Sequence, residues 1–343
     1  MMRKPIAVVF NDVHLKIGNE DAVWIAFKFM IDYMVKHGLK VLIFAGDMFD
    51  DRSAQRSKQL ETFDKMLDLC LAHKIIMYAI PGNHDKTIYE DEYNFMHPFR
   101  HHPAIKYFSK PTVQLIHGRT FTFVPFYDDS VLVPMLEDQV GGDVLISHFE
   151  MKGSEHLGHV SEKKSITKKT LSKWEKTYLG HFHNEQNISE HITHLPSFRQ
   201  TNFGEDVNKG FALIHDDLSY ELIRGKFIEY VKIDIHIDSS TEGELADLRA
   251  EYGNSDKVVR FEFVGTDTAL KAIDKKAFEN LGIQVKIKYT KVFDLDTPSE
   301  APEMIEKYGE EEITESFENF CKEKGYDLNE GTELLVKFFK EKG

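Results

Sequence analysis

The first eighty residues alternate between short apolar runs and amphipathic stretches. Apolar, β-rich residues fill positions 6–10, 41–45 and 75–80, and Asn-Asp, Gly-Asp or Pro-Gly follows each run. Short runs of this kind, bounded by turn residues, are typical of buried strands. Between them, Ala22–Val35 and Ser53–His73 carry apolar residues at helical spacing. This alternation predicts a parallel sheet with right-handed helical crossovers.

The middle of the chain has a different pattern, in which short β-rich runs are separated by turn residues. They occur at Phe108, Val113–Ile116, Phe121–Val124, Val144–Ser147, Tyr178–Leu179, Ile192–Leu195, Phe211–Ile214 and Tyr220–Ile223. We expect these runs to form a second sheet packed on the first, which makes the fold an α/β sandwich.

From about residue 229 a smaller unit is predicted. It has strands at Val231–Ile235, Val258–Phe263 and Val285–Tyr289, with helices at Thr241–Tyr252 and Thr268–Asn280. Pro298 and Pro302 then bracket a linker, and two amphipathic helices follow at Glu311–Lys322 and Asn329–Lys340. The chain therefore divides into 1–228, a main domain, 229–297, a small α/β domain, and 298–343, a linker with a helical tail.

Charge and composition narrow the class of protein. The net charge of −14 counts against a chain that coats nucleic acid without selectivity. Met151–Lys176 is an exception, with seven lysines against three glutamates, and is compatible with phosphate binding. Two widely spaced cysteines fit a reducing compartment, and no apolar stretch or leader suggests a membrane or secretion. We expect a cytoplasmic protein.

Polar motifs follow the predicted strands. They are Asp12-Val13-His14, Gly46-Asp47, Gly82-Asn83-His84-Asp85, Ser147-His148 and Gly180-His181-Phe182-His183. In open α/β sheets, ligands bind at the carboxyl ends of the strands. Each motif alone is weak, since Gly-Asp is a common turn and a single histidine is more often a surface residue. The ordered set of motifs, all at strand ends, predicts a metal site.

The residue types in these motifs indicate which chemistry the site performs. Carboxylate, amide oxygen and imidazole, without thiolate, suit manganese, iron or zinc in a catalytic setting. Side chains two residues apart on an extended segment point the same way, so Asp12 can converge with His14. Two cations need a bridging carboxylate, for which Asp47 is the candidate, and such a pair hydrolyses phosphate esters. His84 could protonate the leaving oxygen or stabilise the transition state.

Taken together and in this order, the motifs resemble those of the calcineurin-like metallophosphoesterase superfamily over roughly residues 5–225. Within it, the chain most resembles the nuclease subunit of the double-strand-break repair nuclease–ATPase complex, which includes the SbcD-type exonuclease and the phage recombination endonuclease subunit. Gly46–Asp50, with its aromatic Phe49, and the segment Leu195–Phe211 carry this narrower likeness. The small unit and the helical tail agree with it.

The resemblance implies a four-layer αββα sandwich with a small α/β capping domain and a helical C-terminal tail. It implies two divalent ions, usually Mn²⁺, with Mg²⁺ also possible. One ion would take Asp12, His14, Asp47 and His183, the other Asp47, Asn83, His148 and His181, and His84 would assist at the scissile phosphate. It further implies DNA ends as substrate, a coiled-coil ATPase partner and a homodimer within a heterotetramer. Asp50 stands where archaeal and eukaryotic relatives have a histidine that is linked to exonuclease action, so the resemblance does not carry over the details of DNA-end handling.

Two further groups of residues are candidates for contacts. For the DNA backbone these are Arg52 and Arg56, which follow the Asp47 motif, and Lys163, Lys164, Lys168 and Lys169. The four lysines belong to a basic run that also includes Lys152, Lys173 and Lys176. A solvated helix face is the alternative interpretation of these charges. For the ATPase partner the candidates are Phe317, Phe320, Leu334, Leu335 and Phe338, which could instead pack on a core of their own.

Other functions stay open at this point. In a phosphatase of the superfamily, arginine follows the aspartate that ends the second motif, and glutamate follows Gly-Asn-His. Here Asp51 and Asp85 occupy those places, so a phosphatase or a small-molecule phosphodiesterase is the weaker alternative. A catalytically silent DNA-end scaffold is the third possibility, and the complete ligand set counts against it.

Overall fold

The computed structural model describes residues 3–156, 159–161, 165–225, 227–237, 242–265, 267–271 and 273–289. The predicted tail helices therefore lie outside the described residues. The same holds for the following candidate contact residues: Lys163, Lys164, Phe317, Phe320, Leu334, Leu335 and Phe338. Among the described residues, no helix combines the length and apolar character that crossing a membrane requires.

The first sheet has the strand order β14-β13-β1-β2-β3-β4. Strands β1 (Pro5–Phe10), β2 (Val41–Ala45), β3 (Ile76–Ile80) and β4 (Ile105–Tyr107) are parallel. Helices α1 (Glu20–Lys36) and α2 (Ser57–Ala72) form the crossovers between them. The predicted parallel sheet is thus confirmed, and its helices begin and end within a few residues of the expected positions.

The prediction for two later strands was wrong. Strands β13 (Gly210–His215) and β14 (Tyr220–Arg224) were expected in the second sheet, but β13 pairs antiparallel with β1 and so extends the first sheet. All of β13 is buried, and its apolar run would be equally well buried in either sheet. The choice between the sheets depends on pairing with a strand about two hundred residues away, which local sequence does not reveal.

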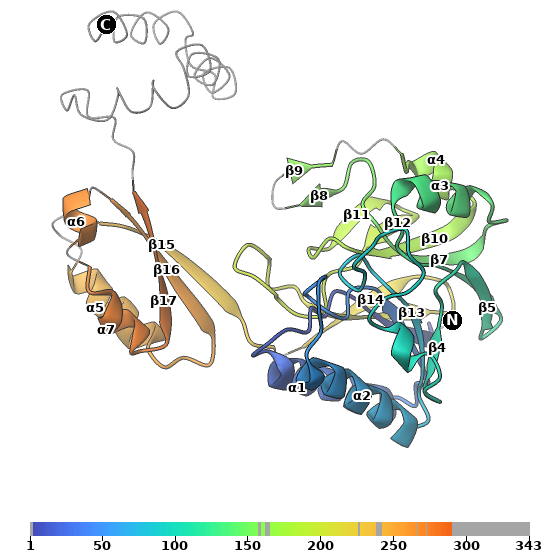
Figure 1. Cartoon of the computed structure of the whole chain (residues 1–343), viewed down its shortest axis with the longest axis horizontal. Coiled ribbons are helices and arrows are strands. Elements are labelled where there is room, and N and C mark those ends of the chain that lie inside the picture. Colours follow the sequence, from blue (N-terminus) through green and yellow to red (C-terminus); the bar gives the residue numbers. More distant parts are fainter. Residues whose placement is uncertain are drawn as a thin grey trace, which may run out of the picture.

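The second sheet has the order β11-β12-β10-β7-β6-β5. Strands β6 (Arg119–Val124), β7 (Gly142–His148), β10 (Trp174–Gly180) and β12 (Ile192–His194) are parallel to one another, while β5 (Thr112–Ile116) and β11 (Gln186–Ser189) are antiparallel edges. Two helices that the sequence did not predict pack against the second sheet (Figure 1). They are α3 (Asp129–Glu137) and α4 (Lys168–Leu171). Strand β8 (Glu155–His156) pairs antiparallel with β9 (His159–Val160), and a 3₁₀ turn, η1, covers His97–Phe99.

Strand β1 illustrates how the layers are joined. Val8 and Phe10 pack in the core beneath α1 and α2, whereas Ala7 and Val9 pack in the core between the sheets. This alternation follows from the two-residue period of a strand. A third core joins the outer face of the second sheet to α3 and α4 through Leu132, Leu136 and Leu171. The result is an α/β protein with two mixed sheets flanked by helices.

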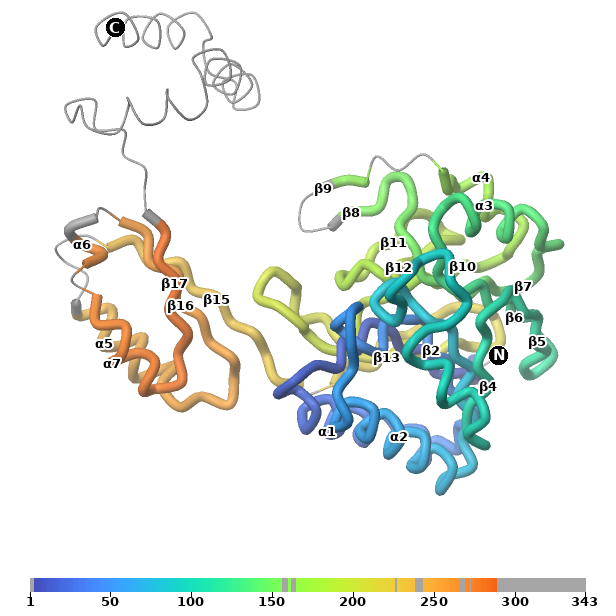
Figure 2. The backbone as a smooth tube through the Cα atoms, viewed as in Figure 1, coloured from blue at the N-terminus to red at the C-terminus, as the bar shows by residue number. Residues whose placement is uncertain are grey.

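A smaller sheet follows the two large ones. Its strands β15 (Tyr230–His236), β16 (Val258–Gly265) and β17 (Ile283–Tyr289) are parallel and share a separate apolar core with α5 (Glu242–Tyr252), α6 (Asp267–Lys271) and α7 (Lys275–Glu279). The expected single helix over 268–280 is two helices, because the Asp274 side chain caps the start of α7. In Figure 2 this unit stands beside the main body.

Candidate metal centre

The loops that follow β1 and β2 lie side by side and carry the first ligand candidates. The Asp12 amide donates to Gly46 O at 2.9 Å, and the Leu15 amide donates to Met48 O at 2.8 Å. Asp12, His14 and Asp47 all have positive φ, at 51°, 48° and 63°. Left-handed backbone at residues other than glycine is uncommon and costs free energy, and it is concentrated at functional sites. The strained backbone therefore lowers the local stability of these loops, and it fixes the directions in which the three side chains point.

Glycines allow these loops to approach one another. A Cβ atom on Gly82 would overlap Asp47 Oδ1, and one on Gly180 would stand 2.6 Å from Ala45 O. Neither position leaves room for a side chain. The Gly residues of the second, third and fifth motifs thus bring the carboxyl ends of β2, β3 and β10 together, as strand-end ligand binding requires.

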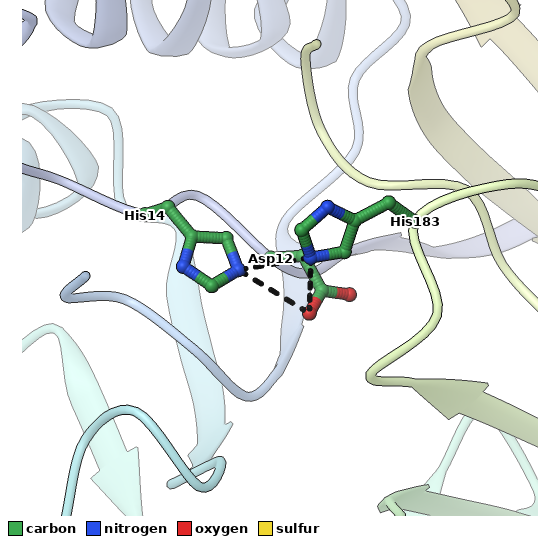
Figure 3. Close-up of side chains that lie close together, drawn as sticks. All are labelled: Asp12, His14 and His183. Carbon is green, nitrogen blue, oxygen red and sulfur yellow. Dashed lines mark hydrogen bonds and ion pairs between the residues drawn. The ribbon is translucent and has the colours of Figure 1, made fainter. Parts of the chain in front are cut away.

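One group of ligand atoms comes from Asp12, His14 and His183 (Figure 3). The two Nε2 atoms of His14 and His183 lie 3.0 Å apart, and each lies 3.8 Å from Asp12 Oδ1. Two imidazole nitrogens about 2.1 Å from one ion and about 90° apart would lie about 3.0 Å from each other. The spacing therefore fits two ligands of the same cation.

A second group lies next to the first. Asn83 Oδ1 is 3.0 Å from His148 Nε2 and 2.9 Å from His181 Nδ1. Asp47 Oδ2 is 3.2 Å from His148 Nε2 and 3.7 Å from His14 Nε2, so it reaches both groups. All the predicted ligand side chains converge here, and Asp47 stands where a carboxylate bridging two cations would stand.

Electrostatics of the buried carboxylates favour positive charge in this cluster. Burial by itself would raise the pKa of Asp47, but the adjacent His148 and His14 imidazoles bring that pKa well below its usual range. Burial opposes protonation of His148 too, yet Asp47 raises the His148 pKa to about 9. Asp12 and Asp47 are essentially inaccessible to water. Buried anions need compensating charge, which bound cations supply.

Asp85 holds the backbone of Asp47 in place, a role that sequence reasoning missed. Its carboxylate accepts the backbone N–H groups of Asp47 and Gly82 on Oδ2, at 3.0 and 2.9 Å, and those of Met48 and Phe49 on Oδ1, at 2.9 and 3.1 Å. Burial and the Asp47 charge raise the pKa of Asp85 to about 7. Its place directly after Gly-Asn-His was the only signal in the sequence.

His84 lies at the edge of the cluster. Its ring is 4.7 Å from that of His14, and its Nδ1 donates to Asp50 O at 2.6 Å. Its Nε2 is 3.1 Å from Nη2 of Arg52, an exposed side chain. Because Nδ1 carries the proton, Nε2 accepts from the guanidinium. Burial lowers the pKa of His84, so the ring is neutral at pH 7.

The other basic candidates are distributed differently. Lys168 and Lys169 are exposed on α4, and Arg56 is exposed directly before α2. Two lysines of the basic run form hydrogen bonds within the protein. Lys173 Nζ donates to carbonyl groups at the end of α3, and Lys176 Nζ donates to Glu190 O. Among the described basic candidates, only Arg52 contacts a residue of the metal cluster or His84.

Comparisons with known proteins agree with this geometry. Residues 7–237 match the family model described as calcineurin-like phosphoesterase. The chain therefore belongs to the calcineurin-like phosphoesterase family, with a His/Asp cluster suited to two metal ions.

More specific likenesses are distant. The chain is 26% identical over 187 residues to exonuclease subunit 1 of Enterobacteria phage T4, a match that covers 50% of this chain and 53% of that protein. It thus spans about half the length of this relative. A solved structure, the nuclease MPE of Pseudomonas putida, is 16% identical with a TM-score of 0.32, over 64% of this chain and 88% of that one.

Proposed function

We propose that this chain is a manganese-dependent DNA nuclease, with exonuclease and endonuclease action at DNA ends, that works with a coiled-coil ATPase in recombination and double-strand-break repair. The observation that carries the proposal is the position of Asp47. Its Oδ2 lies between His148 Nε2, at 3.2 Å, and His14 Nε2, at 3.7 Å, within a shell of nitrogen and oxygen donors. Such a donor set suits two hard or borderline cations and phosphodiester hydrolysis.

The residues that would hold the ions follow from the two groups. Asp12, His14 and His183 would hold one, Asn83, His148 and His181 the other, and Asp47 both. When bound, the cations would neutralise the phosphate oxygens and supply the attacking hydroxide. This donor set is compatible with Mn²⁺ and, less well, with Mg²⁺, which prefers oxygen ligands.

His84 and Arg52 would act on the phosphate from the open side of the cluster. His84 projects between His14 and the exposed Arg52, so a phosphate at the cations is within reach of both. The guanidinium is fully charged and would bind non-bridging oxygens of the phosphate. Displacement of Arg52 by the phosphate would free His84 Nε2 to contact the leaving oxygen. For His84 to give a proton to the leaving oxygen, the bound phosphate must first raise the pKa of the imidazole, which burial lowers.

DNA as the substrate is supported by the motifs and by the relative in phage T4, whose name states that it is an exonuclease subunit. The word subunit also supports an assembly. Backbone contacts would come from Arg52, Arg56 and the exposed Lys168 and Lys169. The calcineurin-like family includes phosphatases, so turnover must be compared across substrate classes.

The first experiment measures turnover of linear DNA, a phosphopeptide and a cyclic nucleotide by the purified chain with Mn²⁺. We expect degradation of DNA ends to dominate, and His84→Ala to lower it by roughly 10²–10⁴-fold while both ions stay bound. Preferred turnover of the phosphopeptide or cyclic nucleotide would replace the nuclease with a phosphatase or phosphodiesterase. Bound metal with no turnover of any substrate would favour the silent scaffold.

The proposed assembly concerns the rest of the chain. We propose a nuclease domain over 1–228, a capping domain over 229–297 and a partner-binding tail over 298–343, in a homodimer that joins the ATPase in a heterotetramer. Deleting the residues after Pro302 should spare metal-dependent cleavage and abolish ATPase binding in a pull-down. Unchanged binding by the truncated protein would contradict the role of the tail.

A further inference from the structure

The two groups of candidate metal ligands differ in the partner of one histidine nitrogen, the Nδ1 atom that faces away from the proposed ion. His183 turns Nε2 toward Asp12, and its Nδ1 is 2.6 Å from the carboxylate oxygen Oε1 of Glu205. His148 turns Nε2 toward Asn83, and its Nδ1 is 2.8 Å from the backbone carbonyl of Ala45. One imidazole is therefore backed by an anion and the other by a neutral dipole.

The Glu205 carboxylate is buried and is held beside His183 by several hydrogen-bond donors. The side chain is almost fully buried and lies on the loop between β12 and β13. Oε1 also accepts from the Thr201 hydroxyl at 2.5 Å and the Asn202 amide at 2.6 Å, and Oε2 accepts from the Thr201 backbone N–H at 3.1 Å. The Lys209 ammonium is 3.6 Å from Oε2. These donors hold the carboxylate in one position.

This arrangement determines the tautomer of His183. A carboxylate held by so many donors accepts hydrogen bonds and gives none, so the imidazole must carry its proton on Nδ1. Nε2 then keeps its lone pair and faces Asp12. Carboxylate partners of this kind orient metal-binding histidines and make them more basic, and their loss typically costs 10–100-fold in metal affinity.

His14 has a weaker counterpart of the same arrangement. Asp50 Oδ1 lies 3.2 Å from His14 Nδ1, although the two atoms are not aligned as a hydrogen bond, and the Asp50 side chain is 36% exposed. Solvent screens such a charge, so we expect Asp50 to contribute less than Glu205. Both histidines of the Asp12 group nonetheless face carboxylates.

We propose that Glu205 is a positioning residue for His183 and that it makes the Asp12–His14–His183 position bind its cation more tightly than the Asn83–His148–His181 position. The inference rests on the proposed two-metal site and is independent of the substrate. It predicts stepwise loading, in which the first Mn²⁺ enters beside His183.

Calorimetric titration of the metal-free protein with Mn²⁺ tests this order directly. The unaltered chain should show a tighter and a weaker event, with His183→Ala removing the tighter and His148→Ala the weaker. Glu205→Gln should weaken the tighter event 10–100-fold and leave the other within about twofold. Glu205→Asp should restore part of the loss, which a role in packing alone would not. Glu262→Gln, a buried ion-paired carboxylate in the small sheet, is the matched control and should change neither event.

A replacement variant and two double variants complete the titration experiment. If Glu205→Gln does not fold, Thr201→Val removes the hydroxyl that holds Oε1 and should weaken the same event in a smaller measure. Combined with His183→Ala, Glu205→Gln should cause no further loss, whereas with His148→Ala the two losses should add. Equal weakening of both events, or no weakening, would overturn the inference alone. Failure of the unaltered chain to bind two ions would instead remove the proposed function.

Discussion

The guanidinium of Arg52 and the imidazole of His84 form a pair, with Nη2 of the first 3.1 Å from Nε2 of the second. The pair lies at the rim of the cluster, where His84 faces His14 and Arg52 faces solvent. A positive group in this position is available to the phosphate before the phosphate reaches the cations. Arg52 thus links a surface charge to the proposed chemistry.

Replacing Arg52 with glutamine should weaken DNA binding more than it slows the bound reaction. We expect KM to rise by about tenfold and the slope of log affinity against log salt to fall by about one, because one phosphate contact is lost. Cleavage kinetics and binding at several salt concentrations would measure both effects. Arg100→Gln, an exposed arginine whose side chain bonds to His97 O, is the control. An unchanged salt slope in the Arg52 variant would contradict the contact.

Asp85→Asn should destabilise the protein even without metal. The new amide group would turn N–H donors toward backbone N–H groups that now share the carboxylate, including those of Asp47 and Gly82. Leaving buried donors unpaired costs about 1–3 kcal/mol each, so we expect about 3 kcal/mol or more in the free energy of unfolding. Urea unfolding of the metal-free variant measures it. The exposed Asp217→Asn should leave the midpoint nearly unchanged, and an equally small shift in Asp85→Asn would refute the anchoring role.

Gly82→Ala should impair metal binding through a single methyl group. The added Cβ would overlap Asp47 Oδ1, so the β3 loop must move away from the bridging carboxylate. We expect at least a tenfold loss of Mn²⁺ affinity, measured by titration, because Asp47 is the proposed ligand of both ions. Gly243→Ala in α5 adds the same methyl group where no atom lies within 4 Å, and it should bind metal normally. Normal binding by the Gly82 variant would argue against the required close approach.

Burial raises the pKa of the Cys70 thiol to about 12 from an ordinary 9.0. The native state therefore holds this proton when the unfolded state has lost it. The free energy of unfolding should fall as pH rises above about 9, by up to about 1.4 kcal/mol per pH unit from this group.

Urea unfolding between pH 8 and 10.5 tests the role of Cys70, with Cys70→Ala expected to show a shallower decline. The same burial should protect Cys70 from alkylation until the protein unfolds, which peptide mass spectrometry detects. Parallel declines in the two proteins would show that other groups cause the loss.

Much of the candidate metal centre could be inferred from residue order. Each ligand motif follows a strand, and a strand is recognisable from a few neighbouring residues. Because parallel strands end at one edge, Asp12, Asp47 and Asn83 could be expected to meet there. The predicted side chains do converge, and β1, β2 and β3 end where their apolar runs end.

The residues behind the ligands were beyond sequence reasoning. Asp85 and Glu205 lie in segments that the sequence analysis singled out, but their roles depend on which amide or imidazole groups they contact in the fold. Likewise, Lys173 belongs to a basic run, yet its ammonium group caps the carbonyls at the end of α3. Such pairings arise between segments that are distant in the chain, so no local pattern records them.

Periodicity and turn residues were thus sufficient for the α/β class, the parallel core of the first sheet and the placing of polar motifs at strand ends, because each of these is encoded within a few neighbouring positions. Three-dimensional packing was needed to assign β13 to the first sheet, to aim His183 through Glu205 and to leave Arg52 beside His84. Those features depend on contacts across long stretches of chain, where the free energy of the whole fold selects one partner among several that the local sequence would equally accept.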